Sequence, residues 1–185
     1  MPQTYGRCSL LLHPDSRHYT SDDTHTLVTA LQKAGFISQA VNRPDDLVYY
    51  TGDRYLDHIT YLGCSPAIQF EDDSDNKNFC GIKIHHHESA RLIFDQKHPV
   101  VPRCPTCKKP VKNWQESQMG SMIRCDLCNN TSPVEAFNWR KMAGYARLFI
   151  EISDIFPKEA IPQPAFLNIL ADITHEEWSY FYRCR

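Results

Sequence analysis

Two closely spaced pairs of cysteines are the residues of this chain best suited to chemistry. Two residues separate Cys104 from Cys107, and two separate Cys125 from Cys128. That spacing lets a tight turn direct both sulfurs at one ion, and two such turns together give tetrahedral coordination by four sulfurs. The 17 residues between the pairs fit the roughly 15–20 residues typical of zinc sites. We therefore expect the four thiolates to bind one zinc ion.

Around these pairs the sequence resembles the zinc-ribbon family, whose cysteine turns commonly read Cys-Pro-x-Cys, as residues 104–107 do here. The resemblance covers residues 101–131 and implies nothing about the rest of the chain. Family members often have glycine after the second cysteine of each turn, whereas this chain has Lys108 and Asn129. Asparagine tolerates the left-handed backbone that glycine supplies, and lysine does so less readily.

The four thiolate ligands limit which ion can bind and what role it can have. Iron also binds four thiolates, and a Cys-x-x-Cys pair can act as a redox dithiol, so both alternatives stay open. Pro102 and Pro110 flank the first pair and favour a loop over the helix that a redox pair opens. Four cysteines leave a tetrahedral ion no position for water, so the expected site is structural. Because the segment has few large apolar residues, we expect the metal to substitute for a core.

Three consecutive histidines, His85, His86 and His87, form the next candidate site. On a strand, His85 and His87 share one face and could ligate one ion, with Glu88 or His98 completing the set. The simpler interpretation is a polar strand face, because no other acid or histidine pair has matching spacing. A metal-dependent enzyme that uses this strand is the alternative function.

The remaining polar features favour structural roles. The acidic run 71–75 lacks the calcium-loop pattern and predicts a solvated loop, and residues 63–66 predict a turn. No phosphate loop, dinucleotide fingerprint or serine-hydrolase motif occurs in the sequence. Outside the paired motif, free cysteines are often simply buried. We interpret four in this way, namely Cys8, Cys64, Cys80 and Cys184.

Cations and aromatic side chains gather around the cysteine pairs. Residues 97–150 carry a net charge of +6, although the whole chain carries −2. This mixture suits phosphate contact with base stacking, and it suits an acidic protein surface equally well. The alternative is a solvated ribbon with Trp114 packed beneath it. The candidate partner-binding residues are Lys108, Lys109, Lys112, Trp114, Arg124, Arg140 and Lys141.

The composition is ordinary for a globular chain of 185 residues, with 42% hydrophobic and 23% charged residues. Such a chain can bury a core without disulfides. No stretch approaches the roughly 20 apolar residues of a membrane helix, and Leu10–Leu12 is too short for a signal-peptide core. We therefore expect a cytoplasmic protein without a membrane segment. The sequence does not indicate its oligomeric state.

The periodicity of apolar residues predicts an α+β fold, mainly an antiparallel sheet with flanking helices and an inserted four-cysteine ribbon. Residues 1–100 form the α+β domain, 101–131 the ribbon, and 132–185 a helix–strand–helix segment that completes the domain. Strands are expected at 5–12, 36–41, 47–51, 55–62, 66–71, 79–87, 92–94 and 145–152. Helices are expected from Thr20 or Ser21 to Ala34, at 132–143 and at 165–182.

These observations predict a binding or adaptor protein without enzymatic activity. The saturated cysteine site and the lack of a complete catalytic set both favour this interpretation. The zinc ribbon would present a basic surface to either a protein or a nucleic acid.

Overall fold

The computed structural model describes residues 8–20, 24–41, 47–63, 68–71, 79–95, 99–116, 121–156 and 158–184. The long or central strands are β1 (Cys8–Pro14), β2 (Ile37–Ala40), β3 (Val48–Thr51), β5 (Ile82–Phe94), β8 (Ala143–Ile155) and β10 (Trp178–Cys184). Two short pairs are β4 (Ile59–Tyr61) with β9 (Ala160–Pro162), and β6 (Met122–Arg124) with β7 (Thr131–Pro133). The helices are α1 (Thr24–Lys33), α2 (Tyr55–His58) and α3 (Pro164–Thr174), with 3₁₀ turns at Lys112–Glu116 and Val134–Ala136.

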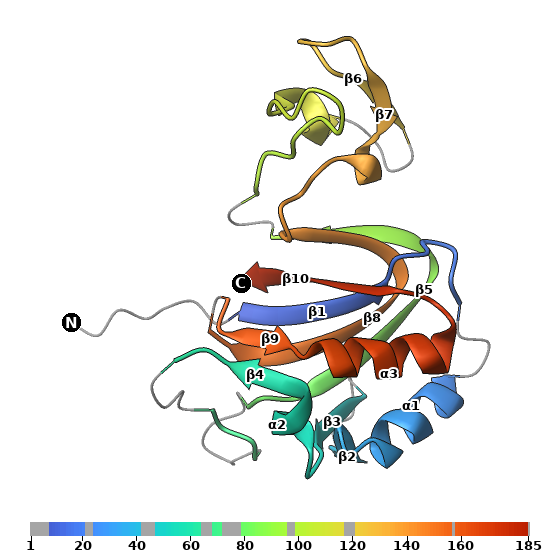
Figure 1. Ribbon diagram of the computed structural model, residues 1–185, viewed down its shortest axis with the longest axis vertical. Coiled ribbons are helices and arrows are strands. Elements are labelled where there is room, and N and C mark those ends of the chain that lie inside the picture. The colour runs from blue at the N-terminus through green and yellow to red at the C-terminus, as the bar shows by residue number, and fades with distance from the viewer. Residues whose placement is uncertain are drawn as a thin grey trace.

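A six-stranded antiparallel sheet in the order β10-β1-β8-β5-β3-β2 forms the centre of the protein (Figure 1). β1 and β10, from the two ends of the chain, pair along one edge of the sheet, and the ribbon is inserted between β5 and β8. The predicted α+β class with an antiparallel sheet and flanking helices is confirmed. None of the described helices is long and apolar enough to cross a membrane.

The main core lies between one face of this sheet and the helices. Alternate residues of β1 and β8 point to this face, among them Leu10 and Ile150, which are fully buried. Leu31 of α1 and Phe166 of α3 meet them from the helical side. Each such side chain stabilises the fold by about 1.5–3 kcal/mol when it leaves water. The apolar face of α1 that the sequence predicts is thus the face that covers the sheet.

The second face of the sheet is covered by parts of β5 and β8 that curve back over it. The register of β5 against β8 shifts between His86 and Arg91, and beyond this point both strands bend over the face (Figure 1). Phe149 and Phe181 are buried in the small apolar cluster that results. The N–H of Tyr182 in β10 donates to the carbonyl of Lys141 (3.2 Å), so the curl nearly closes on the sheet edge.

Four predicted elements are wrong: residues 68–71, the described part of the strand predicted at 66–71, form no strand, and tertiary contacts explain the other three. The strand predicted at 55–62 begins as the short helix α2, which buries Tyr55 against Phe36. The helix predicted at 132–143 is only a 3₁₀ turn, because the backbone of Asn138 pairs with that of Arg103 instead. The helix predicted to end at Tyr182 ends at Thr174, and the chain returns as β10 to pair with β1.

The structure also differs from two expectations about short strands and single cysteines. The runs at 79–87 and 92–94 belong to the single long strand β5. Cys8 and Cys184, interpreted as free thiols, face each other across β1 and β10 and form a disulfide. Disulfides are rare in the cytoplasm, so this bond does not support the expected cytoplasmic location, which stays a prediction. Cys64, His98 and most of the acidic run 71–75 lie outside the described residues.

Gly144 permits the close approach of β8 to β10, which gives a first testable prediction. A Cβ atom there would lie 2.4 Å from Cε1 of Phe181 and 2.6 Å from Cδ2 of His13. The Gly144→Ala variant should therefore lose about 1–3 kcal/mol of unfolding free energy, measured by urea denaturation. At Gly63 the nearest atom would be 3.6 Å away, so Gly63→Ala is the matched control and should change stability little. Equal effects of the two substitutions would contradict the tight closure.

Candidate metal centre

The two cysteine turns have the same backbone geometry. The N–H of Lys108 donates to the carbonyl of Cys104 (3.0 Å), and the N–H of Asn129 donates to that of Cys125 (2.8 Å). Both residues adopt a left-handed backbone, with φ of 62° at Lys108 and 58° at Asn129. Lysine therefore occupies the conformation that glycine usually supplies. The departure at Lys108 does not alter the turn.

The four cysteine sulfurs lie together at one point between these turns. Sγ of Cys104 is 3.7 Å from that of Cys128, and Sγ of Cys107 is 3.7 Å from that of Cys125. All four sulfur atoms lie within 4.8 Å of one another. In the part of the chain that the structure describes, this is the single group of three or more Cys, His, Asp or Glu side chains placed to hold a metal ion.

The electrostatics of the cluster favour a cation at its centre. The backbone N–H of Cys107, followed by that of Thr106, lowers the pKa of Cys104 to about 6. At Cys128 the backbone hydrogen bond from Asn130 acts in the same direction, but desolvation and the three neighbouring thiols raise its pKa to about 11. Four sulfurs this close cannot all be charged on their own. A bound dication would remove that conflict.

The ribbon has a core of its own, contrary to our expectation that a metal would have to replace one. Trp114 lies 4.8 Å from Trp139 and 5.2 Å from Phe94 between ring centroids. Trp114 and Trp139 are each only 6% exposed. The buried members of this ribbon core are Cys104, Val111, Trp114, Ile123, Cys125, Val134, Phe137 and Trp139. Several of them lie beyond residues 101–131, so analysis of that segment alone missed them.

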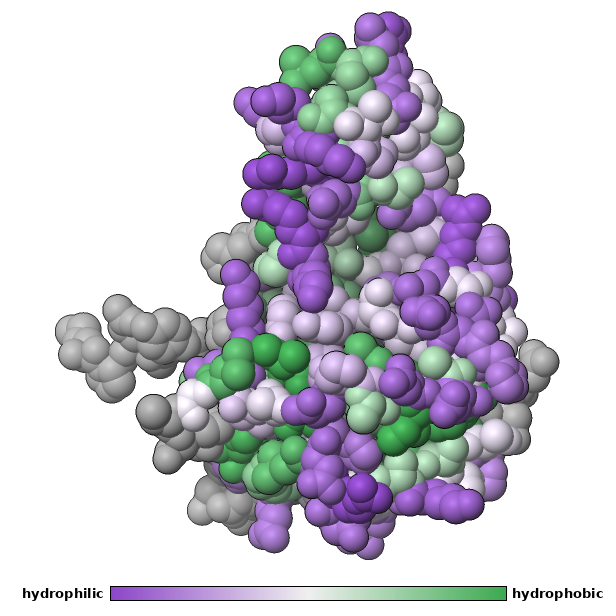
Figure 2. Space-filling view, in the orientation of Figure 1, coloured by the Kyte–Doolittle hydropathy of each residue, from purple (hydrophilic) through white to green (hydrophobic). Residues whose placement is uncertain are grey.

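The candidate partner-binding residues divide into one buried side chain and several exposed ones. Trp114 packs beneath the ribbon, as in the alternative interpretation, and is not available to stack on a base. The six cations are all exposed, namely Lys108, Lys109, Lys112, Arg124, Arg140 and Lys141. Figure 2 shows hydrophilic side chains along one flank of this part of the molecule, and apolar side chains near its tip. Met122 and Leu127 are the most exposed apolar residues of the ribbon, at 60% and 68%.

The histidine strand does not form a metal site with other described side chains. His85 and His87 share a face, as predicted, and their rings are nearly parallel with centroids 6.4 Å apart. Nε2 of His85 is bonded to Oε2 of Glu151 at 2.7 Å, so this ligand atom is engaged. Nε2 of His87 is buried and has no hydrogen-bond partner in the structure. Burial is also the main cause that lowers the pKa of His87.

Glu151 is the buried charge at the centre of this face, and its role was not predicted. Its side chain is 2% exposed and accepts hydrogen bonds from His85, from Ser9 (2.6 Å) and from Arg183 (2.8 Å). Desolvation acts to raise the pKa of Glu151, but the hydrogen bonds and the charge of Arg183 outweigh it and hold the pKa well below its usual range. The available signal was a single acid within the apolar strand run 148–152, since a buried carboxylate requires partners.

Comparisons with known proteins do not assign this chain to a family. No family model matches it, and neither a curated protein nor a solved structure does. The four-cysteine cluster is compatible with a zinc-ribbon-like site on geometric grounds alone.

Glu151 should make stability depend on pH. Its lowered pKa stabilises the fold at pH values above the unfolded-state pKa of about 4.3, and this contribution is lost as the pH falls further. At pH 7, Glu151→Gln should cost about 3 kcal/mol, because it leaves Arg183 without its counter-charge. The difference from the unsubstituted protein should shrink below pH 4.

Urea unfolding at several pH values measures this effect. Asp57→Asn is the matched control, because the pair of Asp57 with Arg54 is largely exposed and contributes little. A pH-independent loss at Glu151→Gln would show that packing, and not charge, is responsible.

Proposed function

We propose that this protein is a non-enzymatic binding protein in which one structural zinc ion holds the ribbon, and the ribbon presents a cationic surface to an acidic protein partner. The observation that carries the proposal is the convergence of four cysteine sulfurs on one point. A tetrahedral ion with zinc–sulfur bonds of about 2.3 Å has sulfur–sulfur edges of about 3.8 Å. The Cys104–Cys128 and Cys107–Cys125 sulfur separations of 3.7 Å match that edge.

The ligand set supports a structural role over a catalytic one. Four thiolates complete a tetrahedral shell, so the ion has no position left for water or substrate. Cys104 and Cys125 are buried members of the same ribbon core as Trp114. The ion would therefore hold two sides of one small core together. Zinc is favoured because it has no redox chemistry and accepts this geometry without strain.

The exposed side chains of the ribbon favour a protein over a nucleic acid. Stacking on bases requires exposed aromatic rings, and the tryptophans of this region are buried. On β6, Met122 and Arg124 share the exposed face, and Arg124 also reaches Oδ1 of Asn129 (2.7 Å) in the second cysteine turn. Exposed methionine and arginine beside Leu127 are typical of protein interfaces. The surrounding lysines indicate that the partner surface is acidic.

Metal analysis tests the structural ion. We expect one zinc per chain by elemental analysis, and we expect Cys125→Ser to lower that ratio sharply, with red-shifted tryptophan fluorescence as the ribbon core opens. Cys80→Ala is the control, because Cys80 is buried outside the cluster and should leave the metal content unchanged. Bound zinc contributes about 10–16 kcal/mol of apparent folding free energy in such sites, so chelation should unfold the ribbon.

Other results of the same measurement would contradict the proposal. Iron in place of zinc would give visible absorption bands and would overturn the choice of metal. A second, exchangeable ion lost on His85→Ala would support a metal-dependent enzyme on the histidine strand instead.

The acidic partner is tested by column retention. The protein should bind immobilised polyglutamate more strongly than immobilised duplex DNA, with retention that falls as salt screens the charges over about 10 Å at 0.1 M. The triple variant Lys108→Glu, Lys109→Glu, Arg124→Glu should elute much earlier. Lys33→Glu on α1, remote from the ribbon, is the control for net charge. Retention on DNA that depends on the same three residues would identify a nucleic-acid surface. Retention that is unchanged in the triple variant would exclude the ribbon surface as the binding site.

A further inference from the structure

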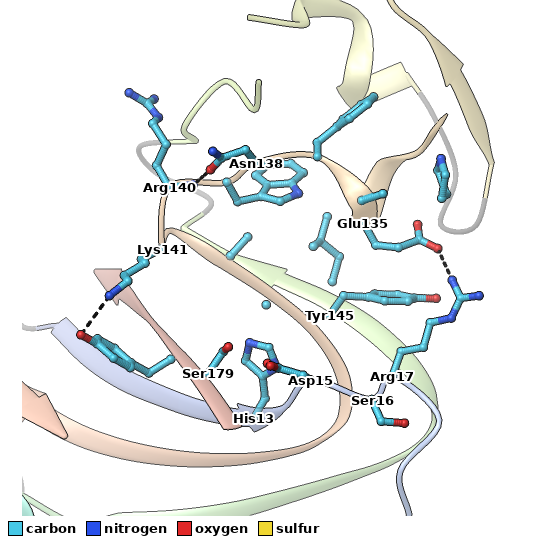
Figure 3. A pocket seen from close by; sticks show the side chains of 18 of the residues that line it. His13, Asp15, Ser16, Arg17, Glu135, Asn138, Arg140, Lys141, Tyr145 and Ser179 are labelled. Atoms are coloured by element: carbon cyan, nitrogen blue, oxygen red, sulfur yellow. Dashed lines mark hydrogen bonds and ion pairs between the residues drawn. The ribbon is translucent and has the colours of Figure 1, made fainter. Parts of the chain in front are cut away.

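A groove of about 610 Å³ lies between the base of the ribbon and the main sheet (Figure 3). Its sides come from segments far apart in sequence: the end of β1 with the loop after it, the start of β8, β10, and the ribbon base at residues 133–141. Its volume lies within the roughly 300–1,000 Å³ of small-molecule sites, which often form where two parts of a fold meet.

Apolar side chains line the middle of the groove, and the acid Asp15 lies beside His13 (Figure 3). Leu92, Ala143 and the rings of Trp139 and Tyr145 form this apolar floor. The indole N–H of Trp139 donates to the carbonyl of Val134 (3.2 Å), so the groove meets the carbon surface of that ring. Nδ1 of His13 is bonded to the carbonyl of Pro14 (2.9 Å), and burial lowers the pKa of His13, so this ring is neutral. An apolar or aromatic body would fit against this floor.

One end of the groove carries Lys141, while the side chain of Arg140 at the same rim points away from the cavity (Figure 3). Nζ of Lys141 donates to the hydroxyl of Tyr180 (3.1 Å) and lies 4.4 Å from the centre of its ring. Within the described residues, neither Arg140 nor Lys141 has a carboxylate at ion-pair distance. Because the Tyr180 oxygen accepts from Lys141, its own proton is free to donate to a ligand. Ser179 adds a second hydroxyl at this end.

The backbone at these cations is held in an uncommon conformation. Arg140 and Lys141 are consecutive left-handed residues, with φ of 53° and 56°, and neither is glycine. Oδ1 of Asn138 accepts the N–H of Arg140 (2.9 Å) and supports this turn. Such strain costs free energy and collects at ligand clamps. Here it sets two neighbouring cations at the rim of the groove.

At the opposite end of the groove, a cation and an acid neutralise each other. Nη1 of Arg17 and Oε1 of Glu135 form an ion pair at 2.9 Å, in which the glutamate side chain is only 7% exposed. This pair neutralises the nearest acid of the ribbon base. The other acid that lines the groove is Asp15, which lies near His13 and Ser179 and away from Lys141 (Figure 3).

We propose that this groove binds a small carboxylate with an apolar or aromatic body. The body lies on the floor formed by Leu92, Ala143 and Trp139. The carboxylate meets Lys141 and the hydroxyl of Tyr180. This site is separate from the outer ribbon surface of the proposed function, so either can fail without the other.

Titration calorimetry on the full, metal-loaded chain tests the site with three probes. We expect 4-phenylbutyrate to bind on the order of tenfold more tightly than 4-phenylbutylamine, which has the same body and the opposite charge. Acetate, which lacks the body, should bind as weakly as the amine. The NMR signal of the Trp139 indole N–H should shift with phenylbutyrate.

Matched variants locate the binding to the groove. Lys141→Met removes the charge that meets the carboxylate and should weaken phenylbutyrate binding several-fold, whereas Arg140→Gln removes a charge that points away from the cavity and should change binding little. Lys112→Met removes a ribbon charge outside the groove and should leave binding unchanged. Equal binding of the amine, no response to any probe, or equal effects of all three substitutions would overturn the proposal. Thermal unfolding of each variant confirms that the fold is retained.

Discussion

The pairing of β5 with β8 is the interaction on which the rest of this structure depends. These two strands of 13 residues each form the centre of the sheet and also carry the ribbon. The first half of β5 and the second half of β8 bury Ile82 and Ile150 beneath the helices, and the other half of each strand bends across the opposite face. A sheet this twisted needs a local irregularity to bend, and the register shift after His86 supplies it.

That bend links the two parts of the molecule that could bind other molecules. It brings the start of β8 to the edge of β10, where Gly144 leaves room for Phe181 and His13. The ribbon core continues from this point, since Phe94 at the end of β5 packs on Trp114. The ribbon is therefore rooted in the sheet by apolar contacts as well as by the chain. A rigid root is what a surface needs in order to present side chains in fixed positions.

Charged side chains are paired internally at the centre of the sheet, whereas they stay exposed to solvent on the ribbon. Within the sheet, Glu151 is surrounded by Ser9, His85 and Arg183, so its charge is satisfied internally. At the ribbon, lysines and arginines stay exposed and leave a positive field toward solvent. His85, from the histidine run that looked most like a second metal site, thus serves the first arrangement. A buried carboxylate requires such partners, and His85 is one of them.

Local spacing was enough to predict some of these features and not others. The four-cysteine cluster, the helix that covers the sheet and the shared face of His85 and His87 follow from residue types at short, regular intervals, because turn geometry and strand periodicity act over a few residues. The irregular backbone at 134–142, the strand at 178–184, the Cys8–Cys184 disulfide and the partners of Glu151 depend on segments far apart in the chain. Their conformations are decided by burial and pairing with distant residues, such as Arg103 with Asn138 and β10 with β1. The groove at the ribbon base has the same origin, because its apolar floor and its cationic end come together only when β8 bends back onto β10.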